Sequence, residues 1–374
     1  MPRTGYANLP LHGGTPPRWL YKRMVELSKA IIDVMSDNYN QQTLLKRLSD
    51  PFWFQSLTCV LGFDWHSSGT TTVSCAALKE AINQMNTNIA FAGGKGKASK
   101  LTLQEIQSHG QHYNLSTNTI QTLQRASRMT AKIDNSAIQD GYSLYHHSMI
   151  LTQHGHWGVI QQGINQTEGY ARRYHWNSEG LGSYIASPHQ AILGSPQQQT
   201  LNMVSKNSTK TQQISVELIC DHPSHLIEDW SKLARPQHQT TLERWMEQQE
   251  HNNILPCLTM PRTINWQKMK ELYEFQPKNY EELLSIKGVG PKTIRALALI
   301  SDLIYGEKPS WKDPVKYTFT VGGKDGVPYP VDCKTMDQTT QLLKQGIQQA
   351  KIGDKQQLQA LKRLKKIAPP CTSN

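Results

Sequence analysis

The sequence Leu284-Ser-Ile-Lys-Gly-Val-Gly-Pro-Lys-Thr-Ile-Arg-Ala-Leu-Ala-Leu-Ile300 predicts two helices joined by a tight turn. Asn279 is typical of the residue that caps a helix, so a short helix is expected from there to about position 285. Gly288 and Gly290 permit a turn that a residue with a Cβ would resist. Pro291 suits the first position of the second helix, because its missing N–H would have no partner there. The sequence therefore predicts a helix, a glycine hairpin and a second helix.

This hairpin also predicts a site for an anion. The N–H groups at the start of a helix have no partner within the helix and carry partial positive charge. Lys292 adds a full positive charge in the first turn, and a nucleic-acid phosphate is the expected occupant. The predicted phosphate-binding residues are Lys287, Gly288, Val289, Gly290, Thr293 and Arg295.

The positive charge of the chain is concentrated around the hairpin. The whole sequence of 374 residues has a net charge of +11. Positions 261–374 contain 19 Lys and Arg against 11 Asp and Glu, whereas positions 1–260 contain 21 against 18. A basic region of this kind is typical of nucleic-acid binding. We therefore expect DNA as the partner.

Length and composition favour a cytoplasmic protein of two domains. No stretch approaches the roughly 20 apolar residues of a membrane span, and the first residues have no apolar core of a signal peptide. A chain of this length suggests two domains, and Pro, Ser, Gln and Asn are enriched at about 187–213, which suggests a boundary there. We expect an α+β fold, with a mixed α/β domain at 1–200 followed by an all-α domain at 201–374.

The N-terminal part offers a second group of candidate residues. A buried strand is predicted at about 57–63, and Asp64 and His66 would lie at its end. The hydroxyl groups at 67–72 suit phosphate oxygens, although they would equally satisfy the backbone of a turn. The possible site in this domain comprises Asp64, His66, Arg128, Asp134, Asp140, Arg172 and Arg173.

Several other stretches combine positive charge with features that suit nucleic acid. The segment 93–100 interleaves glycines and lysines and predicts a mobile basic loop. Arg125, Arg128 and Lys132 are spaced so that they share one face of a predicted helix. The sequence Arg172-Arg-Tyr-His-Trp176 mixes cations with aromatic rings, which suits base stacking; packed aromatic residues under two surface arginines are the alternative. Strands are expected near 145–151 and 157–163, with a turn at Gly155.

Two resemblances add to these expectations. From Thr4-Gly5 through Asp64-Trp-His-Ser-Ser-Gly-Thr-Thr and Tyr170-Ala-Arg-Arg-Tyr-His-Trp to the hairpin, the chain resembles a family of archaeal and bacterial proteins of unknown function. The hairpin Gly288-Val-Gly-Pro-Lys-Thr resembles the helix-hairpin-helix motif, and the C-terminal part is similar to DNA glycosylases of the endonuclease III type.

The second resemblance implies a DNA-repair reaction. In the bifunctional members of that superfamily the hairpin carries a catalytic lysine, and an essential aspartate follows at the start of a helix. Lys292 matches the first, and Asp332 in Pro330-Val-Asp matches the second. Their separation of 40 positions is roughly twice the usual one, so the loop at 310–328 would be an insertion. The resemblance implies a glycosylase with AP-lyase activity on damaged or abasic duplex DNA. The cysteine cluster that holds an iron–sulfur cluster in many relatives is missing, so no such cluster is expected.

Other functions stay open on sequence alone. A metal-dependent nuclease could use Asp64, Asp134 and Asp140 to hold Mg²⁺ or Mn²⁺, because carboxylates are the ligands that such ions require. The hairpin would then serve only to hold DNA. In a non-enzymatic DNA-binding protein, Lys292 would contact phosphate and Asp332 would only cap a helix. The glycosylase interpretation needs no metal or other cofactor.

Overall fold

The structure is a computed structural model that describes residues 9–62, 67–234 and 259–315, together with residues 341, 343–345, 347–348 and 357–362. Asp64, His66 and Asp332 lie outside these residues, as does most of the predicted loop at 310–328. Among the described helices, none combines the length and apolar character that crossing a membrane would need.

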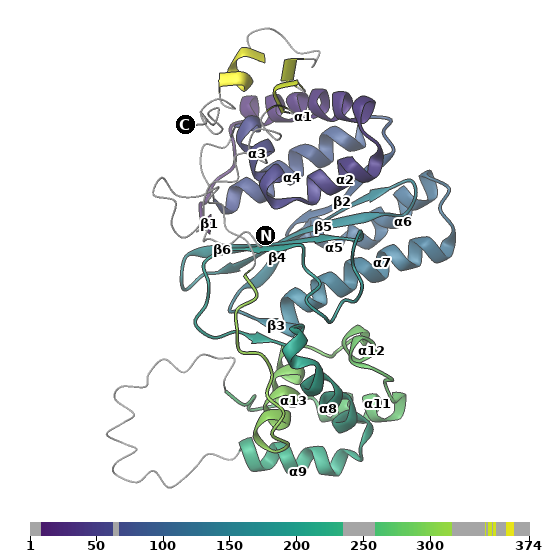
Figure 1. The fold of residues 1–374 in the computed structure, drawn as a ribbon, viewed down its shortest axis with the longest axis vertical. Helices are drawn as coiled ribbons and strands as arrows, with labels where there is room; N and C mark the ends of the chain where they lie inside the picture. Colours follow the sequence, from purple (N-terminus) through teal and green to yellow (C-terminus); the bar gives the residue numbers. More distant parts are fainter. Residues whose placement is uncertain are drawn as a thin grey trace, which may run out of the picture.

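An antiparallel sheet lies at the centre of the structure (Figure 1). Its strand order is β1-β6-β5-β4-β2, with β7 paired to β6, while β3 and β8 form a separate pair. The strands are β1 (Leu9–Pro10), β2 (Ile89–Lys95), β3 (Ile138–Gln139), β4 (Ser143–Thr152), β5 (Trp157–Asn165), β6 (Tyr170–Asn177), β7 (Ala191–Leu193) and β8 (Leu201–Asn202). The predicted hairpin of β4 and β5 is confirmed, and Gly155 in its turn has a φ of 81°.

Both faces of the sheet are buried by helices. Side chains alternate along a strand, so Ile150 packs with the helices on one face and Met149 and Leu151 pack with those on the other. Burial on both faces explains why these strands are almost continuously apolar or buried rather than alternating between apolar and polar residues.

The helices of the first face come from the N-terminal part of the chain. They are α1 (Arg18–Asn38), α2 (Gln41–Ser49), α3 (Pro51–Leu61) and α4 (Ser68–Asn83). The strand predicted at 57–63 is wrong, because α3 occupies that stretch. The Asp50 side chain accepts a hydrogen bond from the Trp53 N–H, and Pro51 fills the first helical position. A buried helix can be apolar on all sides, and its sequence then resembles that of a buried strand.

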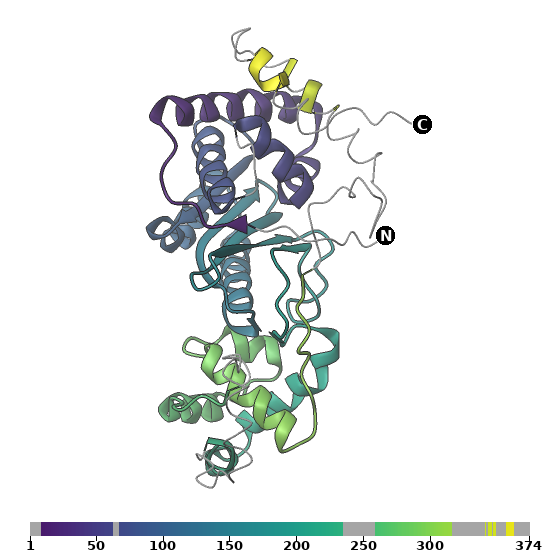
Figure 2. The same cartoon turned by 90° about the vertical axis from the view of Figure 1, so that its left-hand side faces the viewer.

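The remaining helices lie on the other side of the sheet, where α6 and α7 cover its face and the C-terminal helices pack beyond α7 (Figures 1 and 2). They are α5 (Lys97–Lys100), α6 (Thr102–His112), α7 (Thr117–Lys132), η1 (Ile133–Ala137), η2 (Lys206–Ser208), α8 (Thr209–Cys220), α9 (Pro223–Ala234), α11 (Trp266–Phe275), α12 (Tyr280–Ser285) and α13 (Pro291–Leu303). The prediction of a loop at 93–100 is wrong, because the first residues of this segment complete β2 and the last ones form α5.

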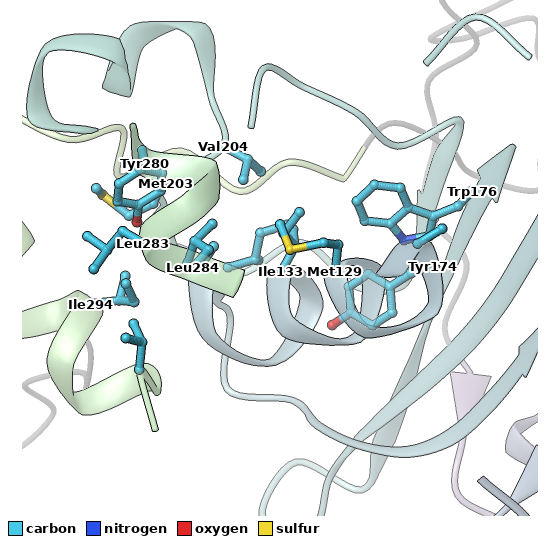
Figure 3. Packing of buried hydrophobic residues seen from close by; sticks show 14 of the residues in the cluster. Met129, Ile133, Tyr174, Trp176, Met203, Val204, Tyr280, Leu283, Leu284 and Ile294 are labelled. Atoms are coloured by element: carbon cyan, nitrogen blue, oxygen red, sulfur yellow. The ribbon is translucent and has the colours of Figure 1, made fainter. Parts of the chain in front are cut away.

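One hydrophobic cluster joins the sheet to the C-terminal helices (Figure 3). Trp176 of β6 lies at one end and Ile294 of α13 at the other, with Met129 of α7 and Leu284 of α12 between them. Helices and an antiparallel sheet together agree with the predicted α+β class. The division at 200/201 stays a prediction, and the cluster is continuous across that point.

Candidate nucleic-acid interface

Helices α12 and α13 form the predicted hairpin, which we call the α12–α13 hairpin (residues 279–303). The Asn279 side chain accepts a hydrogen bond from the Glu282 N–H at 2.9 Å, which confirms the predicted cap of α12. Pro291 is the first residue of α13, as its fixed φ favours. Between them, the N–H of Val289 donates to the carbonyl of Ile286 at 3.3 Å. The local sequence alone therefore determines this hairpin.

The turn of the hairpin is held against the protein on its inner side. Val289 is fully buried, and Gly288 has a φ of 95°, a conformation that L side chains rarely adopt. A Cβ at Gly288 would also lie only 3.0 Å from the Cε of Lys268 in α11. Glycine at position 288 thus satisfies both the backbone conformation and the close approach of a neighbouring helix.

The outer side of the hairpin presents positive charge. Lys287 and Lys292 are exposed, whereas Thr293 is buried. Gly290 is the N-cap of α13 and offers no side chain to accept the N–H groups of the first turn. These groups and the positive end of the 13-residue helix lie beside the two exposed ammonium groups. Such a surface can bind an anion that approaches from solvent.

Helix α7 places its three predicted cations next to the hairpin. Arg125 pairs with Glu281 of α12 at 2.5 Å, and Lys132 donates to the carbonyl of Ile286 at 3.3 Å. Arg128 lies between them on the same face of α7 and is exposed. The shared face is therefore confirmed, but Arg125 and Lys132 are engaged with α12 and the residue that follows it, whereas Arg128 is exposed and makes no ion pair among the described residues.

Two lysines behind the turn were not among the predicted site residues. Burial, and then the positive charge of Lys268, lowers the pKa of Lys132. Lys268 itself pairs with Glu271 at 2.9 Å and packs against Gly288. Helix α11 reaches the turn only through tertiary packing, so no sequence signal links Lys268 to the hairpin. The spacing of the α7 cations was the only sequence signal available for Lys132.

Comparison with known proteins identifies the family of the chain. Residues 5–331 match the family described as Protein of unknown function (DUF763). The chain belongs to this family. The comparisons found no match among curated proteins and none among solved structures.

In this DUF763 protein, Asp134 is the centre of a buried hydrogen-bond network beneath the sheet. Its carboxylate accepts hydrogen bonds from His189 at 2.5 Å, from the Trp176 indole at 2.9 Å and from the Gln161 amide at 2.6 Å. Gln161 in turn accepts from the Nδ1 of His147, whose Nε2 is 2.8 Å from the Ser127 hydroxyl. All of these side chains are buried. The network satisfies polar groups in the core and offers no open face to a ligand.

Asp140 belongs to a different buried cluster. Arg172 pairs with Asp140 at 2.8 Å and with Asp313 at 2.7 Å, and the Tyr174 hydroxyl donates to Asp140 at 2.7 Å. Burial alone would lower the pKa of Arg172, but the two carboxylates outweigh burial and raise it. This cluster joins β6 to the segment 310–315, which also pairs with β8 through Ser310.

Arg173, the neighbour of Arg172, points to the opposite face of β6. Its guanidinium donates to Gln55 at 3.1 Å and to Thr71 at 3.4 Å. Burial lowers its pKa to about 10. Because both arginines are fully buried, neither can contact a phosphate from solvent. The prediction of base stacking by 172–176 is therefore wrong, and so is the alternative of two surface arginines.

Those predicted residues of the N-terminal site that the structure describes therefore do not come together in one site. Asp134 and Asp140 bind separate sets of protein groups, while Arg128 lies at the hairpin. Strand alternation sends His146 and His147 to opposite faces: His146 contacts Ser148, and His147 contacts Ser127. Within the described part of the chain, no group of three or more His, Cys, Asp or Glu side chains could hold a metal ion.

Proposed function

We propose that this protein binds the phosphate backbone of duplex DNA through the α12–α13 hairpin. The observation that carries the proposal is the exposed turn, in which Lys287 and Lys292 flank the uncapped start of α13. Helix N-termini and lysines both favour phosphate oxygens, and neither requires a particular base. Binding should therefore be independent of sequence and sensitive to salt. The resemblance of the sequence Gly288-Val-Gly-Pro-Lys-Thr to the helix-hairpin-helix motif supports the same proposal.

Arg128 extends this surface beyond the hairpin. It is exposed on the face of α7 whose other cations, Arg125 and Lys132, contact α12. A duplex on the hairpin would therefore have a third cation within the same surface. Lys132 serves as a positioning residue, because it binds the carbonyl of Ile286 just before the turn.

Titration of fluorescent duplex DNA at several salt concentrations tests the proposal. Each lost phosphate contact should reduce the slope of log affinity against log salt by about 0.9. We expect the double variant Lys287→Ala/Lys292→Ala to bind at least about tenfold more weakly, with a slope reduced by about 2. Lys206→Ala/Lys210→Ala removes two exposed lysines outside the hairpin and is the matched control. Equal losses in both double variants would refute a hairpin site.

For the reaction, we propose a DNA glycosylase with AP-lyase activity in which Lys292 is the nucleophile. Lys292 is exposed beside the bound phosphate of the proposed complex. Its neutral amine would attack C1′ of the opened abasic sugar, and loss of water would give an imine. Loss of the proton at C2′ would then expel the 3′ phosphate. Asp332, outside the described residues, would stabilise positive charge on the sugar during release of the base.

Borohydride trapping on abasic duplex DNA tests the lyase step separately from binding. The wild-type chain and Lys287→Gln should give a covalent adduct, whereas Lys292→Gln should give none. If the wild type binds DNA but gives no adduct, the lyase proposal fails and DNA binding through the hairpin stands. Strand cleavage that EDTA abolishes would instead support the nuclease hypothesis. The binding of Asp134 and Asp140 to protein groups favours the hairpin proposal over that hypothesis.

A further inference from the structure

A groove of about 670 Å³ lies far from the hairpin, between α1, α4 and the adjoining ends of β2 and β4. Figure 1 shows α1 and α4 together on one side of the sheet and the hairpin helices beyond the other. The groove is formed by stretches that are separate in sequence: the glycine loop at 12–16, the hydroxyl-rich start of α4 and the basic end of β2. Its size lies in the range of small-molecule sites.

The walls of this α1–α4 groove carry an excess of positive charge. Arg18, Lys22 and Lys29 are spaced so that they share one face of α1, and Lys95 faces them from the end of β2. Within the described ranges, none of the four cations makes an ion pair. Two carboxylates, Glu26 and Glu80, also line the groove. Glu80 interacts with Tyr21, which contributes to raising the pKa of that tyrosine to about 12 after the larger effect of burial.

The floor of the groove is fixed by a buried glutamine. The Gln162 amide donates to the carbonyl of Ser68 at 2.9 Å and to the Tyr145 hydroxyl at 2.5 Å, and its oxygen accepts a hydrogen bond from Thr71. The Ser68 hydroxyl accepts a further hydrogen bond from the backbone N–H of His12 at 3.2 Å. One buried side chain thus holds both α4 and β4 at the groove, so its shape is formed before any ligand binds.

Two tyrosines and a short apolar strip complete the lining. Lys95 lies 5.9 Å from the centre of the Tyr145 ring, and Tyr21 provides a second ring on α1. Val25 and Val73 add apolar surface to the same lining. The groove therefore offers positive charge for an anion and flat or apolar surface for a planar group. It is larger than a bare phosphate requires.

From this combination we infer that the α1–α4 groove binds a nucleoside phosphate. The phosphate would lie by Lys22 and Lys95, near the start of α4, and the base would lie against the tyrosines. A free nucleotide and the 5′-phosphorylated end of a nucleic-acid strand share this chemistry. The site is independent of the α12–α13 hairpin, because the two surfaces share no residue.

Calorimetric titration of the full chain tests the inference with four probes: ATP, AMP, inorganic phosphate and a 5′-phosphorylated trinucleotide. We expect saturable binding of a nucleotide and weaker binding of inorganic phosphate. Lys22→Glu and Lys95→Glu should each weaken nucleotide binding by at least about tenfold, because each reverses a charge beside the phosphate. Lys206→Glu, an exposed lysine outside the groove, should leave binding unchanged.

The probes distinguish the source of the ligand. Tighter binding of the trinucleotide than of AMP supports a strand end, and the reverse supports a free nucleotide. No saturable binding of any organic probe, or binding that Lys22→Glu and Lys95→Glu leave unchanged, overturns the inference. Lys287→Ala/Lys292→Ala should keep full nucleotide affinity, while the groove variants should keep hairpin binding to duplex DNA without a 5′ phosphate. These cross-controls show whether the groove proposal, the hairpin proposal or both are wrong.

Discussion

Strand β6 and the α12–α13 hairpin both carry paired cations in the sequence, yet the structure uses them in opposite ways. Arg172 and Arg173 are fully buried and bind oxygens of the protein, whereas Lys287 and Lys292 are exposed. A buried cation is retained only when its hydrogen bonds and charge are satisfied. An exposed cation stays hydrated and can exchange water for a ligand. The comparison teaches that neighbouring groups, rather than residue type, determine what a cation does.

The largest expected effect tests the buried side of the comparison. Arg172→Met would leave Asp140 and Asp313 without their cation. Removing one partner of a buried ion pair costs about 3–5 kcal/mol, so the free energy of unfolding should fall by that amount. Urea denaturation measures it, with Arg128→Met as an exposed control that should change stability by less than about 0.5 kcal/mol. Similar losses in the two variants would contradict the structural role of Arg172.

The buried histidines of the sheet should make stability depend on pH. Burial, followed by His147 and Lys95, lowers the pKa of His146 from 6.5 to about 3. As pH falls below 6.5, the unfolded chain takes up a proton that the folded chain does not. Stability is therefore complete above pH 6.5 and decreases toward pH 3, by about 1.4 kcal/mol per pH unit for this group. Burial likewise lowers the pKa values of His147 and His175.

Urea denaturation at pH 7, 6 and 5 measures this dependence. In the variant His146→Gln, the slope of unfolding free energy against pH should be smaller between pH 6.5 and 5, by the amount that corresponds to one proton. The hairpin sequence contains no histidine, so its contribution to stability should not change in this range. An unchanged slope in the variant would show that His146 does not titrate in this way.

A smaller effect is expected at the turn of the hairpin. Gly288→Ala would place a Cβ at a φ of 95° and within 3.0 Å of the Cε of Lys268. We expect a loss of about 1–2 kcal/mol in unfolding free energy and weaker DNA binding. Gly290→Ala is the matched control, because nothing lies within 4 Å of its Cβ position and its φ of −125° suits any residue. Its stability should match the wild type, and equal destabilisation of both variants would argue against strain at Gly288.

The smallest effect is expected for the exposed ion pair between α7 and α12. The side chains of Arg125 and Glu281 are 47% and 24% exposed. Solvent screens a pair of this kind, so Arg125→Ala should lower the unfolding free energy by less than about 0.5 kcal/mol. Thermal unfolding of Arg125→Ala and of Arg172→Met, measured under the same conditions, compares the exposed ion pair with the buried ones. If Arg125→Ala lowered the unfolding free energy by more than about 1 kcal/mol, solvent exposure would not explain the difference between the Arg125 and Arg172 ion pairs.

The elements that local residues encode could be predicted from the sequence. The Asn279 cap, the Gly288 turn, Pro291 at the start of α13 and the β4–β5 hairpin at Gly155 were all predicted. The region around 57–63 was assigned to a strand because a fully buried helix has no polar face to reveal its period.

The residues of the candidate sites also differ in whether the local sequence indicates them. The exposed lysines of the hairpin follow from its local sequence. In contrast, the pairing of Arg172 with Asp313 joins residues 141 positions apart, and no local pattern indicates it. The α1–α4 groove also brings together the hydroxyl groups at 67–72 and the basic segment at 93–100, which the sequence does not connect as one site.

The sequence by itself determined the hairpin, because a cap, a glycine turn and a proline act through bonds within a few residues. It also determined where positive charge is concentrated along the chain. The tertiary structure decided which cations are available to a ligand, because burial depends on the strands and helices that pack around each one. It buried the arginines of β6, placed the α7 cations beside the hairpin and brought Lys95 opposite α1.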